Sequence, residues 1–166
     1  MATVIFITEQ DIKVKTTLGG NIDIDKMMPI IKSVQDIEVQ PLIGTRLMEK
    51  IENDIESDTL AEPYTTLLNE YIKPVLCWLA ASDYIIVSSY NVNNAGVYRH
   101  EPESGTSLEN REMLSLSDRY KNKGEFYSRR MLDHLQVNSS TYPEYNQWQS
   151  GDMPKQSTAY RTNLLL

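Results

Sequence analysis

The chain repeats apolar side chains at intervals of three and four residues, the spacing that places them on one face of an α-helix. In residues 75–87 nearly every position is apolar, as expected of a helix that other elements surround on all sides. Polar stretches with proline or glycine separate the periodic segments. The pattern predicts an all-α fold, a small helical bundle of about four main helices near residues 25–40, 45–54, 63–90 and 108–135.

The same periodicity predicts which side chains form the core. The third helix should lie at the centre, packed against the first and the fourth. The residues expected in this core are Leu67, Ile72, Val75, Leu76, Trp78, Leu79 and Ile86, facing Ile31, Val34, Met113, Leu116 and Tyr120. Gly124 falls on the same seam of the fourth helix, where the lack of a side chain would let two helices approach closely.

Capping residues and prolines indicate where the helices should begin, bend and end. Residues 3–7 are rich in β-branched side chains and predict a short strand or extended segment before the bundle. Thr8, followed by acidic residues, is expected to cap a short helix that stops near Gly19. Pro41 predicts a break or kink after the first main helix, and Pro74 predicts a kink within the third.

The segment between the third and fourth helices lacks helical periodicity. Residues 91–107 are polar and contain glycines and a proline, so we expect a long loop with an interaction role that the sequence does not assign. Thr106 and Glu109 have the spacing of a capping box at the start of the last helix.

The C-terminal segment combines helix breakers with large apolar side chains. This composition predicts a helical domain over residues 1–137 and an extended C-terminal arm over residues 138–166 that orders against a neighbouring subunit. The residues expected to bind the partner are Tyr142, Tyr145, Trp148, Tyr160, Leu164, Leu165 and Leu166.

Composition and charge narrow the classes of function. Asp and Glu number 23 against 16 Lys and Arg, which gives a net charge of −7 and argues against tight binding of nucleic acid. The longest apolar stretch is interrupted by Ser82 and Asp83, and the N-terminus has no positively charged region, so we expect a soluble protein without a signal peptide. The single cysteine, Cys77, has apolar neighbours and is predicted to be a buried, reduced thiol.

No pattern typical of a catalytic or metal site is present in the sequence. His100 and His134 lack metal-ligand spacing to each other and to Cys77. Phosphate-binding, dinucleotide-binding and nucleophile-elbow motifs are absent. The pair Arg129-Arg130 is more typical of a salt-bridging helix surface than of a binding site. We therefore expect no catalytic residues, no cofactor and no metal, in a protein that is not an enzyme.

Four short motifs follow one another in order along residues 5–87. They are residues 20–23 (GNID), 33–37 (SVQDI), 41–47 (PLIGTRL) and 62–74 (EPYTTLLNEYIKP). This series resembles the head–tail connector, or adaptor, proteins of tailed bacteriophages and prophages, particularly the branch from phages of gut Bacteroidetes. The pairing of Gln35 with the PLIG of residues 41–44 is the motif most like that family.

The resemblance implies a structural virion protein without catalytic residues. It implies a homo-oligomeric ring of about twelve copies below the portal protein, around the DNA channel. Further neck or tail ring proteins would be partners, DNA would pass through the channel without specific binding, and no membrane would be involved. The protein would assemble in the host cytoplasm and reside in the neck of the virion.

Other classes of function remain compatible with the sequence. Another phage neck or tail assembly component would share these features, as would a small cytosolic helical module that binds a regulatory partner. An unusual enzyme would need a polar, ligand-sized pocket with paired groups of shifted pKa.

Overall fold

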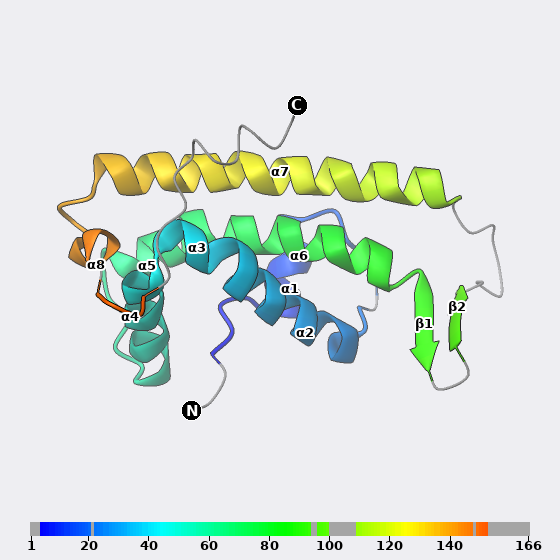
Figure 1. Cartoon of the computed structure of the whole chain (residues 1–166), viewed down its shortest axis with the longest axis horizontal. Helices are drawn as coiled ribbons and strands as arrows, with labels where there is room; N and C mark the ends of the chain where they lie inside the picture. Colours follow the sequence, from blue (N-terminus) through cyan, green and yellow to red (C-terminus); the bar gives the residue numbers. More distant parts are fainter. Residues whose placement is uncertain (1–3, 21, 94–95, 100–108, 148, 153–166) are drawn as a thin grey trace.

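The computed structural model of the chain describes residues 4–20, 22–93, 96–99, 109–147 and 149–152. These residues form a helical bundle with a short β-hairpin at one end (Figure 1), which confirms the all-α fold class. The elements in chain order are α1 (Glu9–Lys15), α2 (Ile24–Val34), the π-helical segment η1 (Gln35–Val39), α3 (Gln40–Ile43), α4 (Thr45–Glu56), α5 (Tyr64–Thr66), the π-helical segment η2 (Leu67–Ile72), α6 (Lys73–Val87), β1 (Tyr90–Asn93), β2 (Gly96–Arg99), α7 (Asn110–Val137) and α8 (Pro143–Asn146).

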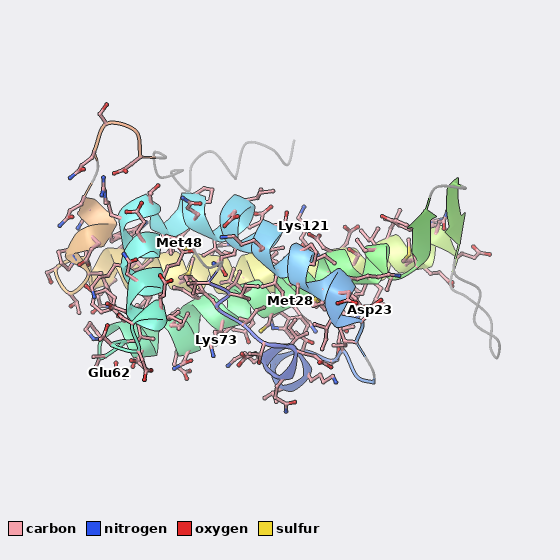
Figure 2. All side chains as sticks on the ribbon, turned by 90° about the horizontal axis from the view of Figure 1, so that it is seen from below. Asp23, Met28, Met48, Glu62, Lys73 and Lys121 are labelled. Carbon is pink, nitrogen blue, oxygen red and sulfur yellow. The ribbon has the colours of Figure 1, made fainter. Side chains whose placement is uncertain are left out.

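The long helices α6 and α7 lie side by side along the length of the molecule (Figure 1). α1 and α2 also pack against α6, and α2 lies on the face of α6 that is turned away from α7 (Figure 1). In Figure 2 the light blue α2 crosses diagonally in front of the green α6, and the dark blue α1 lies beside α6. Because α1, α2 and α7 together enclose α6, nearly every position of its sequence is apolar.

Most of the predicted core is buried. The side chains less than a tenth exposed include Leu67, Ile72, Val75, Leu76, Trp78 and Leu79, together with Ile31, Val34 and Tyr120. Ile86, Met113 and Leu116 are only partly buried. They lie at the end of the α6–α7 pair that adjoins the hairpin, where fewer elements cover the two helices (Figure 1).

Small residues bring α6 and α7 close together. A Cβ atom placed on Gly124 would come within 2.5 Å of Leu79 Cδ2, so the close approach expected at this glycine is confirmed. Further along the seam, the Ser82 hydroxyl donates to the Ser117 carbonyl and the Ser117 hydroxyl donates to the Ser82 carbonyl, both at 3.0 Å. These reciprocal bonds satisfy two buried hydroxyl groups inside an apolar contact.

Two helices widen into a π-helical turn just before a proline. η1 ends two residues before Pro41, and η2 ends two residues before Pro74. The last backbone hydrogen bond of each segment joins residues five apart. A proline ring crowds the carbonyl of the preceding turn, and the wider turn relieves that contact. The predicted distortion at Pro74 is therefore a wide turn, and the break after Pro41 falls at Gly44, whose φ of 85° favours glycine.

The N-terminal segment is fixed to the bundle by a buried amide. Gln35 donates from Nε2 to the Val4 carbonyl at 3.0 Å and accepts from the Phe6 N–H at 3.1 Å. The described residues of this segment form no strand, so the extended alternative applies. The short helix expected after it is α1, where Thr8 and Asp11 form a capping box.

A hairpin occupies the start of the segment interpreted as a loop. β1 and β2 pair antiparallel with Val92 opposite Val97, so the loop interpretation is wrong for these residues. Strand-forming residues on both sides of a two-residue connection were the signal for this hairpin. α7 begins at Asn110 and is capped by Glu109 and Glu112 in place of the expected pair, whose Thr106 lies outside the described residues.

Candidate interaction surfaces

The residues that follow α7 fold back onto the bundle. Tyr142 and Tyr145 are 2% and 7% exposed and belong to the main core cluster. The Tyr142 ring packs edge-on against Tyr64, with 5.7 Å between the ring centroids. Its hydroxyl donates to the Pro63 carbonyl at 3.4 Å and lies 3.1 Å from Nε2 of His134. Tyr142 is thus an anchor between α7 and the start of α5.

Polar contacts hold α8 and the residues after it against α4 and α5. The Tyr64 hydroxyl donates to Glu144 Oε2 at 2.6 Å. Arg46 donates from Nε to Asp152 Oδ2 at 2.9 Å and from Nη2 to Gln149 Oε1 at 2.6 Å. Burial, together with the neighbouring Glu144 carboxylate, raises the pKa of Tyr64, which keeps this phenol protonated as a donor.

The interpretation of residues 138–166 as an arm that orders only against neighbouring subunits is therefore wrong for its described part. Tyr142 and Tyr145, expected to bind a partner, are core residues of their own chain. The helix in this segment spans four residues, which is too short to give a periodic pattern. The remaining residues expected to bind a partner lie outside the described part of the chain: Trp148, Tyr160, Leu164, Leu165 and Leu166.

His134 is the titratable group at the centre of this anchor. Its ring stacks on Tyr71 with 3.9 Å between centroids, and its Nδ1 lies 3.2 Å from Nδ2 of Asn138. Burial and then the charge of Arg130 lower the pKa of His134, so the imidazole is neutral at neutral pH. Since the Tyr142 hydroxyl donates to a carbonyl, the proton on Nε2 of His134 is the one donated to the tyrosine oxygen.

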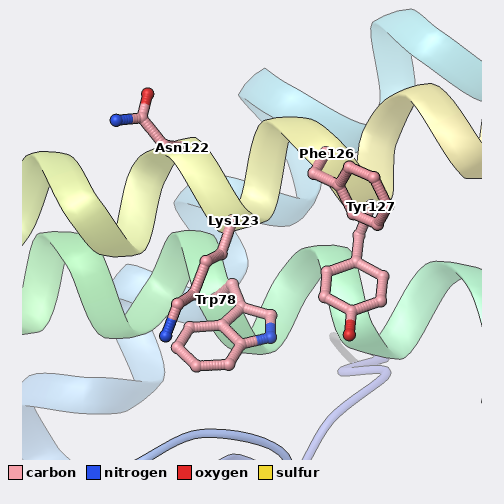
Figure 3. Close-up of a pocket in the computed structure, with 5 residues that line it drawn as sticks. All are labelled: Trp78, Asn122, Lys123, Phe126 and Tyr127. Carbon is pink, nitrogen blue, oxygen red and sulfur yellow. The ribbon is translucent and has the colours of Figure 1, made fainter.

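An apolar groove lies where α7 packs along α6 (Figure 3). It has a volume of about 390 Å³ and is lined by Trp78, Asn122, Lys123, Phe126 and Tyr127. The Lys123 ammonium lies 4.2 Å from the centroid of the Trp78 ring, in a cation–π contact. Phe126 is 62% exposed although it packs edge-on against Tyr127. An aromatic ring that exposed, beside further aromatic rings, is typical of a contact surface.

The sequence pattern did not single out this groove. Tyr127 continues the apolar stripe of α7, but Phe126 lies one residue away from that stripe and Lys123 is a cation. The groove exists because a side chain of α6, Trp78, meets these residues of α7 in space. An aromatic residue beside an otherwise regular apolar stripe was the available signal.

A second exposed apolar surface lies on α2. Ile24 is 52% exposed and Met28 is 44% exposed, and a spacing of four residues places them one helical turn apart. Asp23 and Asp25 are exposed beside them. Figure 2 labels Asp23 and Met28 on α2 where this helix crosses in front of α6, on the face of α6 that is turned away from α7 (Figure 1).

The described residues do not assemble a recognisable chemical site. Among them, no group of three or more His, Cys, Asp or Glu residues could hold a metal ion. Cys77 is fully buried, as expected, and burial raises its pKa to about 12, which suits packing and not nucleophilic attack. His100 lies outside the described residues. None of the helices in the described ranges is long and apolar enough to cross a membrane.

A protein-family model matches residues 39–154 of the 166-residue chain. The model is that of a family of unknown function, DUF6712. The chain belongs to this family. The DUF6712 match begins at the end of η1 and extends past α8, so it contains the groove on α6 and α7, whereas α1 and α2 precede it. No curated protein and no solved structure matches the chain.

Proposed function

We propose that the protein is a head–tail connector, a structural subunit that forms a ring below the portal protein of a tailed bacteriophage. The observation that carries the proposal is the presence of two different exposed apolar surfaces, the groove on α6 and α7 and the outer face of α2. A subunit of a closed ring contacts each of its two neighbours through a different surface. Exposed apolar surfaces are the ones that such contacts bury.

The motif series of residues 5–87 supports the same function, because it resembles that of phage adaptor proteins. The proposal places the chain in the neck of the virion, after assembly in the host cytoplasm. Its partners are further copies of itself, the portal protein and the next ring of the neck or tail.

The charge of the chain suits a channel through which DNA moves. With a net charge of −7, the subunit repels the phosphate backbone and does not hold it. DNA is therefore proposed to pass through the ring without specific binding.

The test is a cryo-EM reconstruction of portal rings from the same phage after mixing with the full chain. The proposal expects an additional ring of helical density on the tail-facing side of the portal. Sedimentation of the mixture should show the chain moving with the portal. A chain that stays monomeric and leaves the portal bare contradicts the proposal and favours a small helical regulatory module. Density at another position in the neck or tail favours a different assembly component.

A further inference from the structure

Positively charged side chains of α7 flank the groove, and one of them, Lys123, lines it. Arg119, Lys123 and Arg130 lie on the same stripe of α7 as Phe126, at spacings of three, four and seven residues. Arg130 stacks on the ring of Tyr71, as Lys123 does on that of Trp78. Within the described part of the chain, no carboxylate forms a salt bridge with any of these three cations. The groove therefore combines an apolar floor with a cationic edge.

The first turn of α2 has the opposite charge around a similar apolar centre. Ile24 and Met28 are about half exposed, and Asp23 and Asp25 are exposed next to them. Asp23 caps its own helix by accepting from the Asp25 N–H at 3.1 Å, and neither carboxylate has a salt-bridge partner in the described ranges. This turn combines an apolar pair with an acidic edge.

The two surfaces lie on different flanks of the molecule. The groove borders the flank of α6 that α1 covers, because Leu18, just beyond α1, packs against the cluster of Trp78 and Tyr120. The first turn of α2 lies on the face of α6 that is turned away from α7 (Figures 1 and 2). The groove and the first turn of α2 therefore cannot contact each other within one chain, but the groove of one copy can contact the first turn of α2 of another copy.

We propose that the first turn of α2 of one copy, with Asp23, Ile24, Asp25 and Met28, docks into the α6–α7 groove of the next copy. Ile24 and Met28 cover Trp78 and Phe126, and the two aspartates pair with the cations at the rim. A contact between two different surfaces is heterologous, and repetition of such a contact closes a ring when the rotation between copies allows it. The inference deepens the proposed function, because it names the surfaces through which the connector ring would close.

Complementary charge identifies the occupant as a second copy. An apolar groove alone would accept many apolar segments, whereas Arg119, Lys123 and Arg130 select one with carboxylates on both sides of its apolar residues. Among the other exposed apolar residues, Val14 lies between Lys13 and Lys15, and Leu114, Phe126 and Val137 lie on α7 itself. Ile37 lies between Asp36 and Glu38, but Asp36 already forms a salt bridge with Lys32 at 2.8 Å. The first turn of α2 is thus the described surface that offers the groove an apolar pair beside two carboxylates that form no salt bridge within the described residues.

A charge exchange tests the pairing. Lys123→Glu places a carboxylate opposite the acidic turn, and Asp25→Lys places an ammonium opposite the cationic rim. Each single variant should weaken association between copies by about tenfold or more, because like charges then meet at the contact. The double variant Asp25→Lys/Lys123→Glu should recover most of the association, measured by sedimentation velocity.

Matched controls make the same change of net charge elsewhere. Arg111→Glu and Glu56→Lys alter exposed residues outside both surfaces and should leave association within about twofold of the unmodified chain. Failure of the double variant to recover association, while all variants keep the circular dichroism spectrum of the unmodified chain, overturns the proposed pairing.

A cysteine pair tests the geometry directly. A mixture of Met28→Cys and Phe126→Cys chains should form disulfide-linked dimers under mild oxidation, whereas neither variant alone should do so. The native Cys77 is buried and does not compete. Val14→Cys, which is 71% exposed on α1, replaces Met28→Cys in the control mixture and should give little product.

The cross-link separates this inference from the proposed function when it is repeated on portal-bound chains. Chains that bind the portal as a ring but do not cross-link overturn the interface and leave the function standing. Chains that cross-link into oligomers but ignore the portal support the interface and contradict the connector function. Chains that do neither contradict both.

Discussion

Gly124 and Leu79 act as one packing unit at the centre of the longest helix pair. The glycine leaves space that Leu79 fills, because a Cβ atom there would lie 2.5 Å from Leu79 Cδ2 and 2.7 Å from Leu79 Cγ. Helix propensity alone would favour alanine at position 124 by about 1 kcal/mol. At position 124 the packing against Leu79 favours glycine whereas helix propensity favours alanine, and the residue present is the one that packing requires.

We expect Gly124→Ala to lower the free energy of unfolding by about 1–3 kcal/mol, because the new methyl group forces Leu79 to move. Leu79→Ala should cost about 2–5 kcal/mol, because it leaves a cavity. In the double variant the methyl group enters that cavity, so the loss should be smaller than the sum of the two. Urea denaturation measures the free energy of unfolding of the two single variants and of the double variant.

Gly19→Ala is the control, because no atom lies within 4 Å of the added methyl group. Additive losses would contradict the contact.

His134 makes the stability of the C-terminal anchor depend on pH. Burial and Arg130 lower its pKa from the ordinary 6.5, so the folded chain binds this proton less readily than the unfolded chain does. The contribution to stability is complete above the unfolded pKa and is lost as pH falls through the folded pKa.

We expect the melting temperature to fall on acidification from pH 7.5 to pH 5.5, and to fall less in His134→Gln, which cannot take up this proton. Differential scanning calorimetry at several pH values in that window measures both slopes. Equal slopes in the two proteins would show that His134 does not titrate between the folded and unfolded states.

Among the elements, the short helix α8 contributes to the core of the bundle although it spans only four residues. It presents Tyr145 to the core, and the residue before it, Tyr142, joins His134, Tyr64 and Pro63. A segment of four helical residues is not stable by itself, so these contacts hold it in place.

We expect Tyr142→Ala to cost about 3–5 kcal/mol, because a large buried ring is removed. Truncation after Asn138 should destabilise the bundle at least as much, since it also removes Tyr145 from the core. Thr141→Ala, at the exposed neighbouring position, should change stability by less than about 0.5 kcal/mol. Thermal denaturation followed by circular dichroism gives the comparison. A truncated chain that melts like the full one would contradict this anchoring role.

The sequence predicted those helices whose own apolar stripe is long enough to be recognised without knowledge of the neighbouring elements. The stripes of α2, α4, α6 and α7 repeat over enough turns to be recognised, and the core of α6 followed from them. It did not predict features that depend on a partner in space. The anchor at Tyr142 needs His134 and Tyr64 from distant segments, and the groove needs Trp78 to meet Phe126.

For the whole molecule, the balance of charge is the property that bears on a DNA channel. Acidic side chains exceed basic ones by seven, and the cations at the groove rim are confined to one stripe of α7. Such an arrangement can recognise an acidic protein surface without attracting the phosphate backbone.

We expect no mobility shift of linear duplex DNA by the full chain at about 0.15 M salt, because the net repulsion outweighs the local cations. Electrophoresis at micromolar protein measures this, and repetition at about 0.02 M salt provides the most permissive condition. A shift at low salt that disappears as salt rises would show phosphate contacts and would contradict passage of DNA without binding.

The π-helical turns before Pro41 and Pro74 are places where the chain can gain or lose one residue without a change in the surfaces of the helices on either side. A π-helical turn accommodates an extra residue without disturbing the faces of the helix on either side. Deletion of one residue from residues 67–72 would close that turn and would keep α6 and the preceding α5 in phase. Homologous chains can therefore differ in length by one residue here and present the same surfaces. If such chains were aligned without a gap at this turn, each residue before the turn would be paired with a residue one position away. The two paired side chains would then point in directions about 100° apart around the helix.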